Sequence, residues 1–289
     1  MKIYDKVFYE GNKKLTRKEK KFLEKLFRNL STLIENECKN AKEGQNREQR
    51  IRALEDNLLK VINQYPELLY VVRYDCYPAA GGFPTNYSIY GKSILFDIKT
   101  NGLNNLLKEL AKDPEICKVT VSSNTCLLFK LIPDPPFSDI ERSVKEYKKE
   151  LDLFKEIYET NPELIYFQDQ KGKSICHYIL ENDYNRYNKY IQDLEPYMLE
   201  SLKSNSIVTY QDKNGNNLGM LFAKKGLQKL FNEAFSNQEA RMQKNNSGET
   251  MEIIANNKGL IIPPLTDKQV YDFYNSIISK KIDKLCKEK

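Results

Sequence analysis

Residues 215–226 read GNNLGMLFAKKG, a pattern that recurs along the chain. The stretch opens on Gly, has a small polar residue at its third position, runs apolar and closes on Gly. A small polar residue ahead of a short apolar run is a helix N-cap, and a Gly directly after the run ends the helix. The pattern therefore predicts a two-turn helix between sharp turns. A helix of that length is not stable alone and needs neighbours.

Four further stretches repeat the pattern, although two of them, at 124–135 and 172–183, do not close on Gly. They are GKSILFDIKTNG at 91–102, the degenerate NTCLLFKLIPDP at 124–135, GKSICHYILEND at 172–183 and GETMEIIANNKG at 248–259. The copies at 91 and 124 are 33 residues apart, as are those at 215 and 248, whereas the two intervals between them are 48 and 43 residues long. Short helices that recur in this way gain stability by stacking on one another. The recurrence therefore predicts a repeat array.

The predicted fold class is all-α, a solenoid of helix–turn–helix repeats. We expect an N-terminal helical region over 1–64, degenerate repeats over 65–265 and a C-terminal capping helix over 266–289. The repeats begin at the pattern copies of residues 91, 124, 172, 215 and 248. The capping helix is indicated by the motif TDKQ at 266–269 and the amphipathic residues after it, since an array needs a helix with one charged face at its open end.

The N-terminal region opens on a capping box, Thr16 to Glu19, which predicts the start of an amphipathic helix. A polar break over 42–49 separates this helix from a second one over about 50–64. The apolar positions of the first helix that share one face are Phe22, Leu23, Leu26, Phe27, Leu30, Leu33 and Ile34. The sequence leaves open whether this region caps the array or forms a separate module.

Between the repeats, proline marks the end of three predicted helices, at Pro66, Pro114 and Pro162. A β-prone, extended stretch is expected after each of them. Residues 73–90 contain PAAGGFP and many aromatics, and predict an inserted Gly/Pro loop. A capping box at 138–141 predicts another helix, to about residue 159.

Charge and hydropathy limit the function classes. The net charge of +6 arises entirely in residues 1–60, and residues 61–289 hold equal numbers of acidic and basic side chains. A balanced array argues against a basic groove, so no nucleic acid is expected as a partner. The chain has no apolar run of membrane-spanning length, and its first residues, MKIYDKVFYEG, lack an apolar stretch of signal-peptide length. The lysines of Lys13–Lys25 leave a weak contact with an anionic membrane surface, or with nucleic acid, as an alternative.

Catalytic motifs are scarce, and we expect a non-enzyme without cofactor or metal. His177 is the only histidine, which excludes multi-histidine metal sites within one chain. Its neighbour Cys176 points about 100° away on a helix, so the two do not form a nucleophile–base pair. Phosphate-binding glycine motifs are missing, and the six scattered cysteines indicate a reduced protein. An enzyme that uses only Asp and Glu remains an alternative.

The 33-residue period, the short Gly-opened helix and the longer second helix resemble the ankyrin-repeat family. The copies at 172–183 and 215–226 carry the resemblance, and Asp169 and Asp212 stand three residues before their glycines, as the turn of that family requires. His177 occupies the position of the family's histidine, which ties the short helix to neighbouring turns. The resemblance covers residues 88–285. The chain departs from the family in lacking the proline of its TPLH motif and in having two overlong repeats.

The resemblance implies a protein-interaction scaffold that binds a folded protein through the turns and the concave face. The composition, rich in Lys, Asn, Ile and Tyr, adds a resemblance to ankyrin effectors of intracellular bacteria. The implied location is cytoplasmic, or the cytosol of a host cell after secretion. The aromatics of the 74–90 loop are expected either to contribute binding energy at an interface or to form a lid over the neighbouring helices at the open end of the stack. The implied contact positions are Tyr87, Ile89, Tyr90, Lys92, Thr100, Asn101, Gln170, Lys171, Lys173, Glu181, Asn182, Lys213, Asn214, Asn216, Lys224, Lys225, Asn246, Ser247, Glu249, Asn257 and Lys258.

Overall fold

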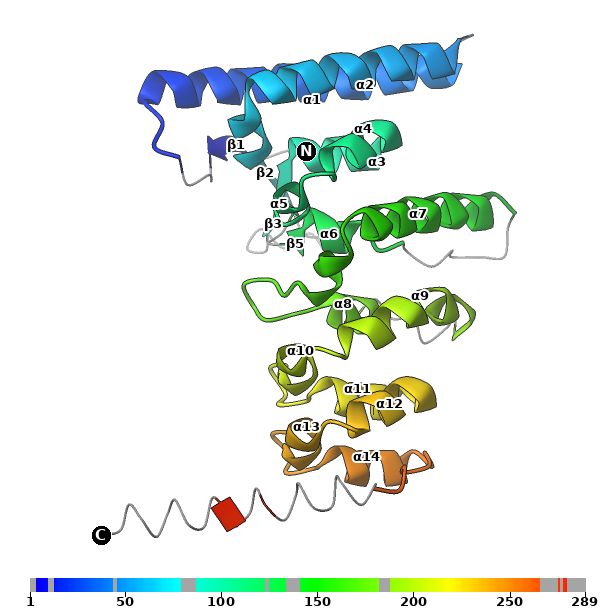
Figure 1. Cartoon of the computed structure of the whole chain (residues 1–289). Helices are drawn as coiled ribbons and strands as arrows, with labels where there is room; N and C mark the ends of the chain where they lie inside the picture. Colours follow the sequence, from blue (N-terminus) through cyan, green and yellow to red (C-terminus); the bar gives the residue numbers. More distant parts are fainter. Residues whose placement is uncertain are drawn as a thin grey trace. The chain divides into compact units, whose positions relative to one another are not determined.

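The computed structural model is predominantly helical (Figure 1), which confirms the expected class in its coarse form. It divides into two compact units, Met1–Leu164 and Ile165–Lys289. This division falls inside the predicted array, not at its expected start after residue 64. The structure describes residues 4–9, 13–43, 46–78, 87–122, 125–133, 141–181, 188–265, 275 and 278–279.

Two long helices dominate the first unit, α1 (Arg17–Glu43) and α2 (Arg47–Gln64), and they run side by side (Figure 1). Against them pack α3 (Ile94–Thr100) and α4 (Asn104–Leu110), α1 on α3 and α2 on α4. The remaining helices of this unit are η1 (Pro66–Tyr70), α5 (Pro114–Cys117), α6 (Leu127–Lys130) and α7 (Glu141–Thr160).

The start of α1 confirms the predicted capping box. The backbone N–H of Thr16 donates to Glu19 Oε2 at 2.6 Å, and the N–H of Glu19 donates to Thr16 Oγ1 at 3.3 Å. The hydrogen bonds from Thr16 hold the pKa of the Glu19 carboxyl below its usual value. Reciprocal bonds of this kind satisfy N–H groups that the first turn leaves without partners.

The buried stripe of α1 is narrower than predicted. Phe27 and Ile34 are fully buried, whereas Phe22 and Leu33, expected on the same face, are 47% and 43% exposed. Because α1 contacts its neighbours along a 3–4 spacing, residues one position to the side of that seam reach solvent. The seam buries Leu23, Phe27, Leu30, Ile34, Cys38 and Ala41.

Two buried carboxylates join α1 and α2 to the next helix pair. Ser31 Oγ in α1 donates to Asp97 Oδ2 in α3 at 2.6 Å. Burial raises the pKa of Asp97, and the bond from Ser31 opposes that rise. Glu55 in α2 accepts from the backbone N–H groups of Asn105 and Leu106, at 3.1 and 3.3 Å, and thereby caps the start of α4. Since buried polar groups need partners, these contacts fix how the two pairs meet.

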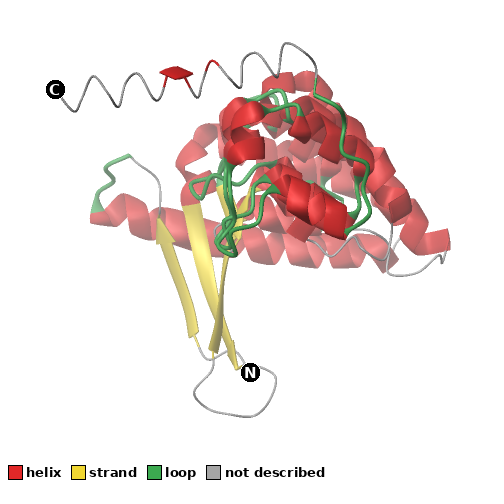
Figure 2. Cartoon of the chain, turned by 90° about the horizontal axis from the view of Figure 1, so that it is seen from below, coloured by secondary structure: helices red, strands yellow, loops and turns green. Residues whose placement is uncertain are grey.

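A five-stranded antiparallel sheet, not predicted from the sequence, completes the first unit (Figure 2). Its order along the sheet is that of the chain, and Asp75 pairs with Tyr90 in the central hairpin. The loop expected over 73–90 is therefore a hairpin, whose residues 79–86 lie outside the described part. The strands are β1 (Tyr4–Tyr9), β2 (Val71–Pro78), β3 (Tyr87–Ser93), β4 (Thr120–Ser122) and β5 (Thr125–Cys126).

The three prolines follow the ends of α2, α4 and α7, as predicted, but an extended stretch does not come directly after them. Each begins a short helical turn instead, as in η1, α5 and η2 (Pro162–Tyr166). Proline suits the first position of a helix, because its missing N–H would have no partner there and its φ is already helical. After η1 and α5 the chain does become extended, in β2 and β4.

In the second unit, short helices form successive layers (Figure 1). Helix α11 contacts both α8 and α14, and α12 contacts α9. Helix α9 continues through Pro196, with the fully buried Leu194 and Met198 on either side. The helices are α8 (Ile175–Glu181), α9 (Asn188–Ser201), α10 (Asn205–Thr209), α11 (Leu218–Lys225), α12 (Gln228–Phe235), α13 (Gln238–Met242) and α14 (Met251–Asn257).

The recurring pattern forms the predicted short helices. Asn217 caps α11 by accepting from the N–H of Met220, and Gly226 ends it with φ 72°. Thr250 caps α14 in the same way, whereas Ser93, at the start of α3, makes no capping bond. The predicted C-terminal capping helix and most of the box at 138–141 lie outside the described residues. Among those described, no helix is both long and apolar enough to cross a membrane.

Candidate functional site

Three turns of the second unit share one set of hydrogen bonds. In each, an Asx side chain, at Asp169, Asp212 or Asn245, accepts from the backbone N–H groups two and four residues later, at 2.8–3.0 Å. The Gly three residues after it has a positive φ, 75° at Gly172 and 76° at Gly215. The side chain thus imitates a backbone acceptor and fixes the turn. Asn245 was not singled out from the sequence, although its position before Gly248 is equivalent.

The second and third turns contact each other directly. The N–H of Asn246 donates to the carbonyl of Asn214 at 3.0 Å, and its side-chain amide donates to the carbonyl of Lys213 at 3.1 Å. Gln211 Nε2 spans the same two turns, with bonds to the carbonyls of Gly215 and Lys244 at 2.5 and 3.0 Å. All four bonds end on backbone carbonyls, and Asn246 is the turn-tip residue whose side chain contributes to them.

Because these two turns lie so close together, we expect a single methyl group added between them to lower the stability strongly. Gly215→Ala places a Cβ 2.8 Å from the backbone N of Asn246, in a conformation with positive φ. We expect a loss of about 2–3 kcal/mol in the free energy of unfolding. Gly226→Ala is the matched control, because φ there is 72° and nothing lies within 4 Å of the added Cβ. It should cost about 1 kcal/mol. If urea unfolding shows equal losses of unfolding free energy for the two variants, the two turns do not approach each other closely at Gly215.

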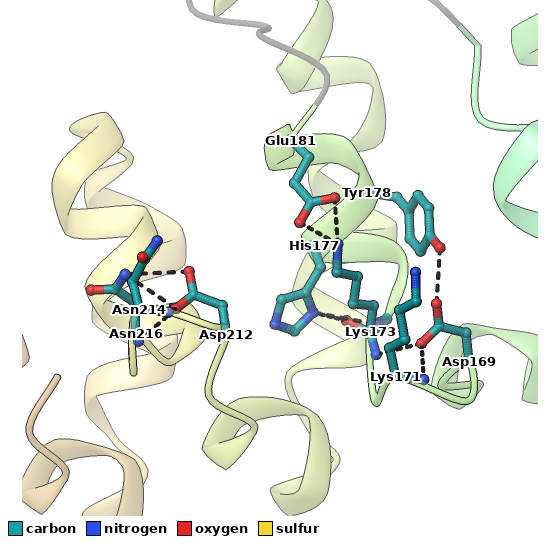
Figure 3. Close-up of polar contacts among 10 residues, drawn as sticks. Asp169, Lys171, Lys173, His177, Tyr178, Glu181, Asp212, Asn214 and Asn216 are labelled. Atoms are coloured by element: carbon teal, nitrogen blue, oxygen red, sulfur yellow. Dashed lines mark hydrogen bonds and ion pairs between the residues drawn. The ribbon is translucent and has the colours of Figure 1, made fainter. Parts of the chain in front are cut away.

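Polar residues lie beside the turns in pairs eight residues apart, such as Lys173 and Glu181 (Figure 3). Lys173 Nζ contacts both carboxylate oxygens of Glu181, at 2.6 and 2.8 Å, and lies over the ring of Tyr178. In the next layer Lys224 Nζ donates to Asn216 Oδ1 at 2.7 Å. These pairs join the second residue of the pattern to the end of its short helix.

Asn216 was predicted as an exposed contact position, and this is wrong. It is 2% exposed, because its side chain bonds Asp212, Lys224 and Asn245. A carboxamide both donates and accepts, so it suits a buried junction of this kind. Asn216 therefore supports the turn, and a partner does not reach it.

The other predicted contact positions fall into four groups. Ile89, Tyr90 and Lys92 lie in β3 and not in a turn, and nothing is described of the side chains of Tyr87, Ile89 and Tyr90. Asn182 lies outside the described residues. Lys92, Asn101, Lys173, Lys225 and Glu249 are half-buried. The exposed positions are Thr100, Gln170, Lys171, Glu181, Lys213, Asn214, Lys224, Asn246, Ser247, Asn257 and Lys258.

His177 is 1% exposed and packs edge-on against Tyr210, with ring centroids 5.0 Å apart. Its Nδ1 accepts from the backbone N–H of Ser174 at 3.2 Å, so Nε2 carries the proton, and it has no hydrogen-bond partner among the described residues. Burial lowers the pKa of the imidazole to about 4, and the charge of Lys173 acts in the same direction. The imidazole is therefore neutral and bonds its own turn. Tyr210, not singled out from the sequence, also covers Gly172.

The thiol beside His177 is a packing group. Cys176 is fully buried, its Sγ lies 2.9 Å from Ser201 Oγ, and burial raises its pKa to about 12. A thiol with such a pKa is a poor nucleophile at neutral pH. The described residues also contain no group of three or more His, Cys, Asp or Glu that could hold a metal ion.

Comparisons with known proteins give no family. No family model, no curated protein and no solved structure matches the chain. The resemblance to ankyrin repeats therefore rests on the sequence pattern alone, and the candidate site rests on the geometry of the turns.

Proposed function

We propose that the chain is a protein-interaction scaffold with an ankyrin-like array, and that it binds a folded protein through its turns and the exposed ends of its short helices. The observation that carries the proposal is the series of Asx turns, whose exposed tips are Gln170 and Lys171, Lys213 and Asn214, Asn246 and Ser247. Their backbones are fixed by hydrogen bonds, so a partner would not have to order them on binding. A surface ordered beforehand loses less entropy in a complex.

The chemistry of the tips favours a protein over a nucleic acid or a small molecule. They carry lysines beside carboxamides and a hydroxyl, without a continuous basic stripe. Lys173 is a half-buried lysine beside the first tip, and its ion pair with Glu181 neutralises its charge. Mixed polar tips on rigid turns suit the polar rim of a protein interface. The resemblance to effector-type ankyrin proteins extends the proposal to a protein of a eukaryotic host.

The test is an affinity capture from eukaryotic cell lysate with the full chain as bait. A Lys171→Ala/Lys213→Ala/Asn214→Ala variant removes three tip side chains and keeps the backbone bonds. The matched control, Lys203→Ala/Lys229→Ala/Asn232→Ala, removes the same residue types from exposed positions outside the turns. We expect the tip variant to capture at least tenfold less of a protein partner than the wild type does. The control should capture as much as the wild type, and the baits should have equal melting temperatures. Retention by both variants would refute binding through the turns.

A further inference from the structure

Arg241 is a buried cation that forms no ion pair with any described residue. It lies in α13 and is 6% exposed, with its guanidinium carbon 5.3 Å from the ring centroid of Phe235. Its Nη1 has no hydrogen-bond partner, and no side-chain hydrogen bond or ion pair joins Arg241 to any described residue. Removing a charge from water without a paired group is costly, and most proteins avoid it. The ring of Phe235 compensates for only part of that cost.

Packing does not explain the arginine. Arg241 stands four residues before the turn residue Asn245. In the two preceding turns the equivalent positions are Ile165, four before Asp169, and Val208, four before Asp212. Both are apolar and buried, at 3% and 1% exposure. An aliphatic residue therefore serves the packing at this position, and the third layer has a guanidinium there instead.

Among the described residues, no acidic side chain pairs with Arg241, and the residue that follows it in α13 is apolar. Glu239, the nearest acidic residue along the chain, accepts a hydrogen bond from Asn205 at 3.0 Å. Met242, directly after Arg241, is 45% exposed although it is large and apolar. Lys244 is exposed and adds positive charge. The edge of α13 thus combines a desolvated guanidinium with an open thioether surface.

We propose that Arg241 and Met242 anchor an acidic segment of a protein partner, in which an Asp or Glu carboxylate pairs with the guanidinium and a neighbouring apolar side chain covers Met242. The proposal rests on the scaffold function above and names the chemistry of its partner. The planar guanidinium matches a carboxylate in geometry, and such pairs are strong where water is excluded. A buried arginine beside a sulfur-containing apolar contact is also typical of interface hot spots.

The test uses the full chain on an array of terminally blocked nonapeptides with a central Asp or Glu and varied apolar flanks. Each peptide has a counterpart with Asn or Gln at its centre. We expect a subset of the acidic peptides to bind, and their counterparts to bind at least tenfold more weakly. Arg241→Met should weaken binding at least tenfold while melting no lower than the wild type, since methionine keeps the contact with Phe235. Lys244→Met, which removes an exposed cation nearby, should weaken binding less than threefold.

Several results would overturn the proposal. One is the absence of any bound acidic peptide; another is equal binding by the wild type and Arg241→Met. The array also carries nonapeptides from residues 266–289, and binding confined to these would assign Arg241 to the chain's own C-terminal segment. One further outcome is a lysate protein that binds Arg241→Met as well as the wild type but fails to bind the tip variant. That result would refute the role of Arg241 as an anchor and still support the scaffold function.

Discussion

Ile34→Asp is expected to unfold the first unit. Ile34 is 0% exposed in the seam of α1, and an aspartate there would lose the apolar contacts and bury an unpaired charge. Removing a buried aliphatic side chain costs about 2–5 kcal/mol, and the charge adds to this. The sum approaches or exceeds the stability of an ordinary domain. Circular dichroism should show a loss of helix at 25 °C, and the amides of α3 and α4 should lose protection in hydrogen exchange.

Leu33→Asp is the matched control for this prediction. Leu33 precedes Ile34 in the same helix but is 43% exposed, so a carboxylate at this position stays hydrated. We expect its cost to stay below about 1 kcal/mol. The comparison also decides the role of the N-terminal helices. Protection of α3 and α4 that survives Ile34→Asp would make α1 and α2 a separate module, whereas its loss would make them part of one core.

The parts of the fold that the sequence predicts are those fixed by neighbouring residues. The capping bond of Asn217 and the positive φ of Gly226 follow from residues within one turn of the chain. The box of Thr16 and Glu19 is equally local. Such signals can be read because the polar group and the backbone atoms that it satisfies are three residues apart. The pattern therefore predicts a short helix at each place where it recurs.

The sheet could not be predicted in this way. Tyr4 pairs with Cys76, and no local pattern indicates a partner so far along the chain. The hairpin of β2 and β3 is joined by residues rich in Gly and Pro, which by themselves indicate only a loop. Because strand pairing depends on distant partners, the local sequence indicates where the chain turns in this region but not the register of its strands.

The candidate site shows the same limit at single residues. The polar character of Asn216 indicated exposure, but Lys224 at the end of α11 and Asn245 in the next turn bond to it and bury it. Arg241 was missed for the opposite reason, since a charged residue is expected at the surface. Only the alignment of its position with Val208, together with the burial of both, shows that it occupies a core position.

The stability of the second unit is expected to fall in mild acid because of His177. Its pKa is about 4 in the folded chain, against about 6.5 for a hydrated imidazole. Between these values the unfolded chain binds a proton that the folded chain does not, so the free energy of unfolding falls as the pH drops from about 6.5 to 4. This pKa difference corresponds to a loss of about 3 kcal/mol in the free energy of unfolding, and the loss is complete near pH 4.

His177→Asn isolates this contribution. The asparagine oxygen can accept from the N–H of Ser174 as Nδ1 does, but it does not titrate. Urea unfolding at pH 7.0, 5.5 and 4.5 should therefore show a smaller loss for the variant than for the wild type, with the difference growing as the pH falls. Every other titratable group is present in both proteins, so the comparison isolates the contribution of His177. Parallel pH profiles would mean that the folded chain accommodates a protonated His177, and that the buried contact with Tyr210 opens in acid.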